Sequence, residues 1–389
     1  MKKLSIRNYL FLAILGTVLS CASGEKKDGA EVKELAVSAK EVVITNSVIE
    51  ITHDSKTLNS FYSIGDIFED HYYAYNQNTH AIDIYSLDTR QHIKTVELED
   101  EGPDGVQKQI FGLNVLNADD FAILTDHYIT RVGTNSKVIQ RLPINGVGPN
   151  EYFIEYNLHA RNNSNFIYDS NTESFLIPQV SMVDQRVTKE FFKHPILAEY
   201  KPNEDLVNPY EVYYPDDFYE KCFGFNDQKS FSYTRQDTVL YALSGYPGIF
   251  VYDRNSKKTA EVKINTDDLQ HNEVFHQPWS TAANLGQQMK TMMKSSQFGP
   301  IAETEDYVIL FYHSALKGDQ NDLRNPFARK DKMMQVYEKE TFKYITTQQL
   351  PEEVILVKDF HIDKNSVIIP VAPKTEDIIR MQKIEINAG

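Results

Sequence analysis

Cysteine is nearly absent from this chain. The 389 residues include two cysteines, Cys21 and Cys222, which excludes a framework of several disulfide bonds. The fold must therefore be held by a buried apolar core, and a chain of this length can form a large one.

Motifs of common enzymes and metal sites are absent as well. The sequence holds no nucleophile elbow, no His-Glu-x-x-His zinc motif, no EF-hand loop, no Cys-x-x-Cys pair and no phosphate-binding loop. His271 and His276 stand five residues apart, a spacing that places them on one face of neither a helix nor a strand. No third ligand is close in the sequence, so we expect no metal site there and no cofactor, and we favour a protein without enzymatic activity.

Positive charge is in short supply. The chain has 40 basic and 55 acidic residues and a formal net charge of −15. Without residues 1–20, which hold three basic side chains and no acidic one, the balance is 37 to 55 and the net charge is −18. Such a surface repels phosphate backbones, so we expect no nucleic-acid partner.

The N-terminus has no apolar run of the roughly 20 residues that a membrane-spanning helix needs. Residues 9–19 form a shorter apolar run, and it follows the basic residues Lys2, Lys3 and Arg7. This pattern is typical of an export signal. We therefore predict a signal peptide over residues 1–20 and an exported protein.

Residues 18–21, Val-Leu-Ser-Cys, resemble the cleavage box of bacterial lipoproteins. The resemblance implies cleavage before Cys21 and diacylglycerol on its sulfur, so that several acyl chains anchor the protein stably to a membrane. Cys222 would then have no disulfide partner. The alternative is a plain secreted protein in which Cys21 is incidental. We expect a lipoprotein of the cell envelope, anchored to the outer membrane on its periplasmic or its surface face.

Residues 21–40 are small and charged and include no aromatic side chain. Such a composition buries too little apolar surface to fold, so we predict a flexible tether. The folded body is then expected over residues 41–389.

A repeated hairpin pattern runs through this body. Each copy has an alternating strand that ends in tyrosine, a polar turn of four or five residues and a second strand, and the clear copies are residues 82–98, 249–264 and 334–350. The equivalent tyrosines are Tyr85, Tyr252 and Tyr337. Looser copies occur at 127–144, 173–192 and 377–387. Alternation with period two and short polar turns predict antiparallel hairpins in which each strand buries one face.

Each hairpin follows another predicted strand pair, so the unit has four antiparallel strands. Repetition of such units predicts an all-β, six-bladed β-propeller of four-stranded antiparallel blades. The strand at 41–52 precedes the first full unit, and we expect it to complete the last blade, which lacks an outer strand. Residues 279–297 predict one inserted helix, and residues 194–220 and 317–331 read as further insertions.

Three Gly-Pro segments stand just before predicted inner strands, at residues 101–105, 146–152 and 298–302. Glycine and proline suit a tight turn between blades, which is a purely geometric role. The alternative is a recognition surface at one mouth of the ring. The candidate binding rim then consists of Gly102, Pro103, Asp104, Gly148, Pro149, Asn150 and Glu151.

With the lipoprotein box and the repeated hairpins, these Gly-Pro segments make the chain resemble the TolB-like six-bladed propeller lipoproteins, a class with a domain of unknown function. The resemblance covers the chain from about residue 41 to its end. It implies the fold and the membrane anchor, and it brings no activity.

Two functions remain open. The first is a noncatalytic binding or scaffold module for an envelope protein, a peptide or a glycan. The second is a cation-dependent hydrolase or lactonase with its site in the propeller channel. The second requires aspartates near strand ends to converge, although most of them are expected to be turn acceptors; these are Asp66, Asp70, Asp119, Asp120, Asp169, Asp216, Asp217 and Asp363.

Overall fold

The computed structural model divides the chain into two compact units, Met1–Ala39 and Lys40–Gly389. The described residues all belong to the second unit. They are 42–52, 64–125, 127–143, 152–154, 167–170, 172–181, 192–193, 195–204, 206–221, 229–235, 237–267, 269–270, 282–316, 330–354, 356, 360–371, 375 and 378–389.

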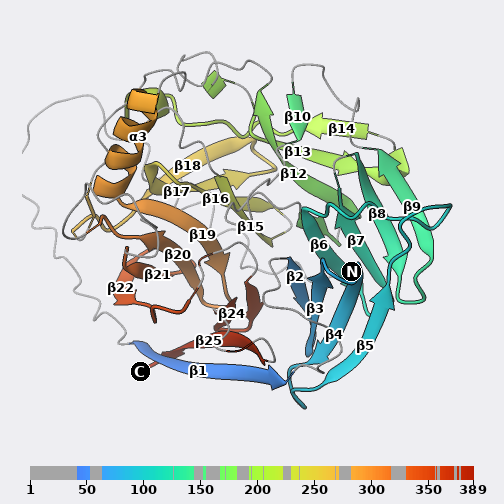
Figure 1. The fold of residues 1–389 in the computed structure, drawn as a ribbon. Helices are drawn as coiled ribbons and strands as arrows, with labels where there is room; N and C mark the ends of the chain where they lie inside the picture. The colour runs from blue at the N-terminus through green and yellow to red at the C-terminus, as the bar shows by residue number, and fades with distance from the viewer. Residues whose placement is uncertain are drawn as a thin grey trace, which may run out of the picture. The chain divides into compact units, whose positions relative to one another are not determined.

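This unit is all-β, and its strands form six antiparallel blades in a propeller ring (Figure 1). Blade 1 contains β2 (Gly65–Phe68), β3 (His71–Asn76), β4 (Ala81–Ser86) and β5 (His92–Glu97). Blade 2 contains β6 (Gly112–Asn117), β7 (Asp120–Leu124), β8 (Tyr128–Gly133) and β9 (Val138–Pro143). Blade 4 contains β15 (Lys229–Arg235), β16 (Thr238–Leu243), β17 (Tyr246–Asp253) and β18 (Lys258–Lys263). Blade 5 contains β19 (Gln297–Glu303), β20 (Tyr307–His313), β21 (Lys332–Glu338) and β22 (Tyr344–Gln349). The predicted fold class is confirmed.

The sixth blade closes the ring as predicted. Its strands are β23 (His361–Asp363), β24 (Ser366–Pro370), β25 (Ile378–Ala388) and, on the outside, β1 (Val42–Thr52) from the other end of the body. β1 pairs with β25 from Val42↔Ala388 to Thr52↔Ile378, and Figure 1 shows the two strands side by side. The buried Arg380 Nε donates to Glu50 Oε1 at 3.0 Å and adds a charged contact to this junction. A ring closed in this way leaves only short, protected strand edges.

Blade 3 departs from the predicted hairpin pattern. Both β10 (Tyr152–Ile154) and β11 (Ile167–Asp169) pair with β12 (Ser174–Ser181), which is followed by β13 (Leu197–Lys201), η2 (Pro202–Glu204) and β14 (Leu206–Pro209). The hairpin predicted at 173–192 is therefore wrong, because the later strand that pairs with β12 is β13, which begins only at Leu197. The segment 194–220, predicted as an insertion, supplies the outer half of the blade. Four of the five β13 residues are buried, so its sequence lacks the alternation that identified the other hairpins.

The middle strands of blades also depart from the expected one-sided burial. Every residue of β4 is buried, whereas four of the six residues of the outermost strand β5 are exposed. A middle strand is covered on both faces because a neighbouring blade packs on each side. Asp83, at the polar step of the β4 alternation, is fully buried and accepts hydrogen bonds from Asn76 Nδ2 at 3.1 Å and Thr95 Oγ1 at 2.6 Å.

One backbone hydrogen bond recurs in the blades and fixes their register. The residue after the third strand donates its N–H to the carbonyl of the aspartate before the second strand, in the pairs Leu87→Asp70 (2.8 Å), Thr134→Asp119 (3.0 Å), Arg254→Asp237 (2.7 Å) and Lys339→Asp306 (2.9 Å). Tyr85, Tyr252 and Tyr337 occupy equivalent positions in their blades. Each pairs across the sheet with the residue that lies two positions after the aspartate of its own blade. All three are buried, which confirms their predicted equivalence.

The predicted inserted helix is α3 (Ala282–Lys294), at the periphery of the ring in Figure 1. Met292 and Met293 are buried, and the amino group of the buried Lys330 donates to the carbonyls of Met292 and Ser295, each at 2.8 Å. A cation at a helix C-terminus satisfies carbonyls that lack helical partners. Within the described residues, α2 (Phe218–Lys221) adds one short helical turn, and no helix has the length and apolar character needed to cross a membrane.

Candidate functional site

The first Gly-Pro segment lies in the connector loop, residues 98–108, which leads from β5 of blade 1 to β6 of blade 2. The loop is closed at its neck, where the Val106 N–H donates to the Glu99 carbonyl at 2.7 Å. Gly102 has a φ of +87°, which favours glycine. A Cβ on Gly105 would lie 2.8 Å from the backbone of Glu101. Both glycines therefore have the geometric role that the sequence suggested.

The tip of the connector loop is fastened to blade 2 by Asp104. Its Oδ1 accepts the Val138 N–H at 3.0 Å, and its Oδ2 accepts a hydrogen bond from Lys137 Nζ at 2.8 Å. The hydrogen bond from Lys137, followed by that from the Val138 N–H, lowers the pKa of Asp104 below its ordinary value. Asp104 is thus occupied in holding the loop against the turn between β8 and β9.

The base of the connector loop is fastened to blade 1 by His80, which is 4% exposed. Its Nε2 lies 2.9 Å from the Val106 carbonyl and 3.4 Å from Asp100 Oδ1, and its Nδ1 lies 2.9 Å from Tyr75 Oη. Tyr75 Oη donates to the Lys108 carbonyl at 2.8 Å, and Lys108 Nζ pairs with Asp100 at 2.6 Å. Burial raises the pKa of Tyr75, so this group stays a hydroxyl donor.

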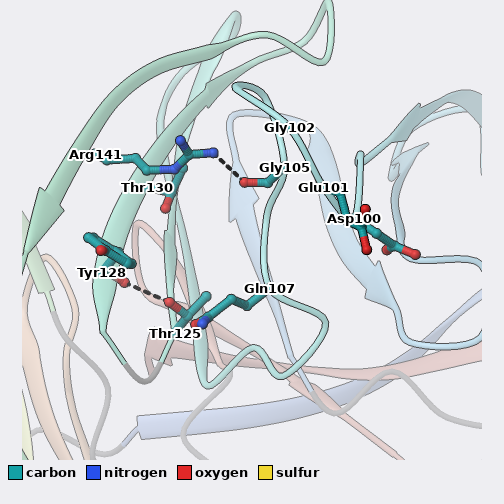
Figure 2. A pocket seen from close by; sticks show the side chains of 9 residues that line it. All are labelled: Asp100, Glu101, Gly102, Gly105, Gln107, Thr125, Tyr128, Thr130 and Arg141. Atoms are coloured by element: carbon teal, nitrogen blue, oxygen red, sulfur yellow. Dashed lines mark hydrogen bonds between the residues drawn. The ribbon is translucent and has the colours of Figure 1, made fainter.

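A pocket of about 390 Å³ lies between the connector loop and blade 2. Its lining residues are Asp100, Glu101, Gly102, Gly105, Gln107, Thr125, Tyr128, Thr130 and Arg141. Figure 2 shows the Arg141 side chain, which comes from β9, reaching the Gly105 carbonyl, to which it donates a hydrogen bond. The pocket therefore has one wall from the connector loop and a second wall from blade 2. Its volume is within the range of small-ligand sites, roughly 300 to 1,000 Å³.

Of the predicted rim residues, Gly102 lines this pocket, while Pro103 and Asp104 belong to the same loop without lining it. Cys21, Gly148, Pro149, Asn150 and Glu151 lie outside the described residues. The third Gly-Pro pair, Gly299-Pro300, lies inside β19 and not before it, at a register shift between Phe298 and Ile301. A β-bulge accommodates proline, which has no N–H to donate to the sheet.

Sequence reasoning missed the strand side of the pocket. Tyr128 and Arg141 fall in the hairpin predicted at 127–144, yet nothing local marks them as pocket residues. They face the connector loop only because the loop folds back over blade 2. The contact between Asp104 and Lys137 joins residues 33 positions apart, so no local pattern in the sequence reveals it.

Most of the aspartates considered for a channel cation site have side-chain partners in the structure; these are Asp66, Asp119, Asp120, Asp169, Asp217 and Asp363. Asp66, on the inner strand β2, accepts the Ile67 N–H at 2.9 Å and the Val115 N–H of blade 2 at 2.7 Å. Asn114, at the equivalent place on β6, accepts the Tyr168 N–H of blade 3 at 2.9 Å. These bonds tie successive inner strands together. The described residues contain no group of three or more His, Cys, Asp or Glu side chains that could hold a metal ion, and His271 and His276 lie outside them.

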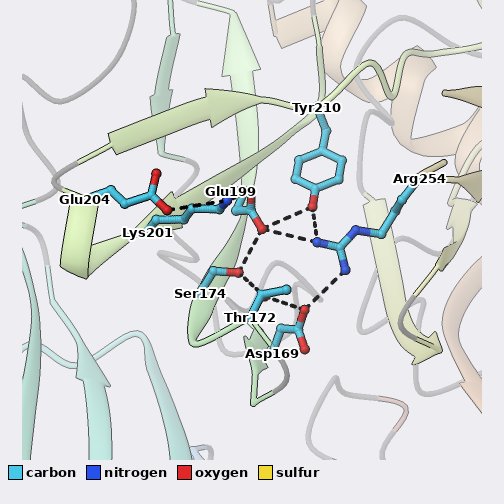
Figure 3. A network of polar contacts seen from close by, with 8 residues as sticks. All are labelled: Asp169, Thr172, Ser174, Glu199, Lys201, Glu204, Tyr210 and Arg254. Atoms are coloured by element: carbon cyan, nitrogen blue, oxygen red, sulfur yellow. Dashed lines mark hydrogen bonds and ion pairs between the residues drawn. The ribbon is translucent and has the colours of Figure 1, made fainter.

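A second polar network joins blades 3 and 4 (Figure 3). Arg254, in the turn after β17, lies 3.2 Å from Asp169 Oδ2 and 3.2 Å from Glu199 Oε1, and it donates to Tyr210 Oη at 2.5 Å. The side chains of Arg254 and Asp169 are 13% and 1% exposed, so the charges are largely removed from water. Ser174 Oγ also donates to Glu199 Oε1, at 2.9 Å. Every charged group here has a partner, which indicates a structural tie between blades.

Similar proteins share this architecture. A DUF4221 family member from Bacteroides vulgatus has a crystal structure that matches with a TM-score of 0.73 and 13% identity, over 90% of this chain and 100% of that one. A candidate exported protein of Bacteroides fragilis matches with a TM-score of 0.51 and 9% identity, over 88% of this chain and 95% of that one. At these identities the likeness shows the fold alone.

Among curated proteins none matches the sequence. The predicted kinship with TolB-like propellers stays a prediction. Residues 30–346 match the domain of unknown function DUF4221, which is more than half of the chain. The chain therefore belongs to the DUF4221 family, and within it the described residues form a six-bladed β-propeller.

Proposed function

We propose that this protein is a noncatalytic binding or scaffold module of the cell envelope, held to the outer membrane through an acylated Cys21, that recognises an envelope protein, a peptide or a glycan. The observation that carries the proposal is the pocket of about 390 Å³ beside the connector loop, whose wall is fastened at both ends. The sequence of residues 1–21 supports the anchor, and the pocket supports recognition.

The hydrogen bonds that hold the loop favour binding. They order the loop when the protein folds, so the entropic cost of ordering it does not fall on the binding step. His80 holds the base of the connector loop and Asp104 holds its tip. A ligand that enters the pocket therefore does not have to immobilise this backbone. A preorganised site binds its ligand more tightly than a flexible one.

The side chains around the pocket favour binding over catalysis. The lining set includes neither histidine nor cysteine, and within the described residues no hydrogen bond joins a lining hydroxyl group to Asp100 or Glu101. Asp100 is paired with Lys108 at 2.6 Å, and the hydrogen bond from Lys108 lowers the pKa of Asp100 below its ordinary value. A carboxylate held in this way serves poorly as a proton donor near neutral pH.

The proposal is tested by a photo-reactive cross-linker at Gln107, in the full chain expressed in intact cells. Gln107 is an exposed lining residue, so a cross-linker there reaches an occupant of the pocket. The matched control carries the cross-linker at Lys258, an exposed residue of blade 4. We expect a specific adduct from position 107 that Asp104→Ala reduces at least several-fold, because the loop tip is released.

The control substitution is Asp88→Ala, at an exposed turn of blade 1. The hydrogen bonds to Asp104 lie at the surface of the protein, so their loss is expected to leave the protein folded. Equal adducts from positions 107 and 258, or an adduct that Asp104→Ala leaves unchanged, would contradict recognition at this pocket.

A further inference from the structure

The blade 2 wall of the pocket is formed by one face of the hairpin β8–β9. Thr130 on β8 and Arg141 on β9 are direct cross-strand partners, and Tyr128 lies two residues before Thr130. Side chains two positions apart in a strand lie on the same face of the sheet. Figure 2 shows these three side chains along one wall, with Gln107 of the connector loop at the end of the pocket opposite Arg141. The register of the hairpin therefore determines which blade 2 side chains reach the pocket.

The two carboxylates in the lining set lie outside the space between this wall and the loop. Figure 2 shows the side chains of Asp100 and Glu101 beyond the loop backbone at Gly105 and pointing away from Arg141. Asp100 is also paired with Lys108 at 2.6 Å. The space between the loop backbone and β8–β9 is therefore bounded by one cation and by neutral polar side chains.

Among the described residues that line the pocket, Arg141 carries the one positive charge. Its guanidinium donates to the Gly105 carbonyl, which holds it in place, and it has no carboxylate partner among the described residues. Both carboxylate oxygens of the nearby Asp104 are occupied, by Lys137 Nζ and by the Val138 N–H. A guanidinium has five N–H donors, so most of those of Arg141 remain available to an anionic group of a ligand.

Thr130 adds a buried hydroxyl group to the same wall. The residue is 3% exposed, and its hydroxyl makes no hydrogen bond within the described part of the chain. A buried polar group without a partner costs free energy, because it has lost its hydrogen bonds to water. Thr130 lies between Arg141 and Tyr128 in Figure 2. A ligand oxygen placed at Arg141 therefore also has a hydroxyl donor within the same wall.

Tyr128 is held in place although 38% of it is exposed. The N–H and the Oγ1 of Thr125 both donate to its carbonyl, at 2.9 Å and 3.2 Å, which closes the turn into β8. Its ring lies edge-to-face against His127, with centroids 6.4 Å apart. An aromatic ring held in this way presents an apolar surface to a ligand side chain at low cost in conformational entropy.

A carboxylate is the anion that fits this wall, because arginine pairs with carboxylates through charge-assisted hydrogen bonds. Multiply charged ligands are disfavoured, since the chain has a formal net charge of −15 and both Asp100 and Glu101 lie close by. This argument excludes phosphates, nucleic acids and acidic polysaccharides, which carry a charge on every unit. A peptide with neutral side chains carries its single negative charge at its C-terminus.

We infer that the pocket binds the free C-terminal carboxylate of a peptide or protein, with the carboxylate at Arg141 and Thr130 and the last side chain against the ring of Tyr128. This inference rests on the proposed function and names its ligand class. Gln107, at the other end of the pocket, offers one donor and one acceptor to the last peptide group. Recognition therefore depends on the end of a partner chain.

The test measures binding of defined peptides to the full chain in detergent, by fluorescence anisotropy and calorimetry. The probes are acetylated hexapeptides with neutral internal residues, which differ only in their last residue, one for each standard amino acid. Each is made with a free C-terminal carboxylate and as the C-terminal amide, and oligogalacturonate is the acidic sugar probe. The variants are Arg141→Gln and Thr130→Val. The matched control is Arg90→Gln, which removes another exposed arginine, in the turn between β4 and β5.

We expect at least one free-acid peptide to bind about tenfold more tightly than its amide, as a charge-assisted hydrogen bond requires. Arg141→Gln should bring this ratio close to one, Thr130→Val should lower it several-fold, and Arg90→Gln should retain it. Because loosening of the connector loop would weaken acid and amide alike, the ratio reports the contact between Arg141 and the carboxylate.

Equal binding of acids and amides would overturn the carboxylate inference and leave the proposed function standing. A preference for the acid that Arg141→Gln leaves unchanged would overturn the assignment to this pocket. Binding of oligogalacturonate alone would overturn the choice of a peptide. Absence of binding by every probe would overturn the inference as a whole, and the cross-linking experiment at Gln107 then decides the proposed function separately.

Discussion

The Nε2 atom of His80 lies 2.9 Å from the carbonyl oxygen of Val106. This contact joins the turn after β3 to the connector loop, across 26 residues of sequence. The ring is buried between Tyr75 and the loop backbone, and the His80 backbone has a φ of +52°. One side chain therefore determines where the loop leaves blade 1, and with it one wall of the pocket.

Replacement of His80 is expected to loosen the connector loop. His80→Asn keeps a residue that tolerates a positive φ, yet it removes the ring that contacts Tyr75 and Val106. Buried polar groups would lose their partners, which is expected to cost about 1–3 kcal/mol of unfolding free energy. Urea unfolding measures this loss, and hydrogen exchange of the Val106 amide reports local opening. His127→Asn, in the turn before β8, is the control; an unchanged Val106 exchange rate in His80→Asn would contradict the role of His80.

The Arg254 network is expected to be a major contributor to cohesion between blades 3 and 4. Arg254→Met removes the cation from between Asp169 and Glu199, and it leaves buried carboxylates without compensation. Loss of one partner from a buried ion pair destabilises a protein by about 3–5 kcal/mol. The exposed neighbour Lys258→Met is the control and should change stability by less than about 0.5 kcal/mol. A loss in Arg254→Met as small as in the control would show that the network contributes nothing.

The stability of the protein should respond to pH through Lys330. Burial lowers its pKa to about 7 from the ordinary 10.5. Below the folded pKa, Lys330 is protonated in both the folded and the unfolded protein. Between the two values the unfolded chain keeps its proton while the folded protein has lost it, so stability rises with pH across this window.

Lys330→Met tests this pH dependence. Urea unfolding measures the free energy of unfolding at about pH 7 and at about pH 9. Between these two pH values, this free energy should rise by about 1–2 kcal/mol more in the unaltered protein than in Lys330→Met. The upper pH of about 9 lies below the ordinary tyrosine pKa of about 10, so ordinary tyrosine side chains stay protonated throughout the measurement. Lys258→Met, on the surface, should retain the full rise. An equal rise in Lys330→Met and the unaltered protein would show that the amine does not titrate there.

The proposed membrane anchor rests on Cys21. Cys21→Ala removes the sulfur that the lipoprotein box assigns to the acyl chains, so we expect the protein to move from the membrane fraction to the soluble fraction. Cys222→Ala is the matched control and should stay with the membranes. Ultracentrifugation of cell fractions, followed by immunoblotting, measures the distribution. Membrane retention of Cys21→Ala would contradict the assignment.

Local sequence pattern was enough to predict the blades that follow the repeat closely. The alternation around Tyr85, Tyr252 and Tyr337, followed by polar turns, identified three outer hairpins, and the strand at 41–52 was expected to complete the last blade. The hairpins depend on residues that are close in the sequence, and the role of the strand at 41–52 follows from the outer strand that the last blade lacks. Both features can therefore be read from the sequence. Blade 3 was not, because β13 is buried on both faces and shows no alternation.

The residue pattern was sufficient to predict the class of fold, the repeated hairpins and the position of the connector loop between two blades. The folding of this loop back on blade 2 appears only in the assembled ring, where Asp104 contacts Val138 and where Glu101, Tyr128 and Arg141 line one pocket. Hairpin patterns arise from interactions between residues a few positions apart. The pocket arises from contacts between separate blades, and no local period encodes which side chains the closed ring brings together.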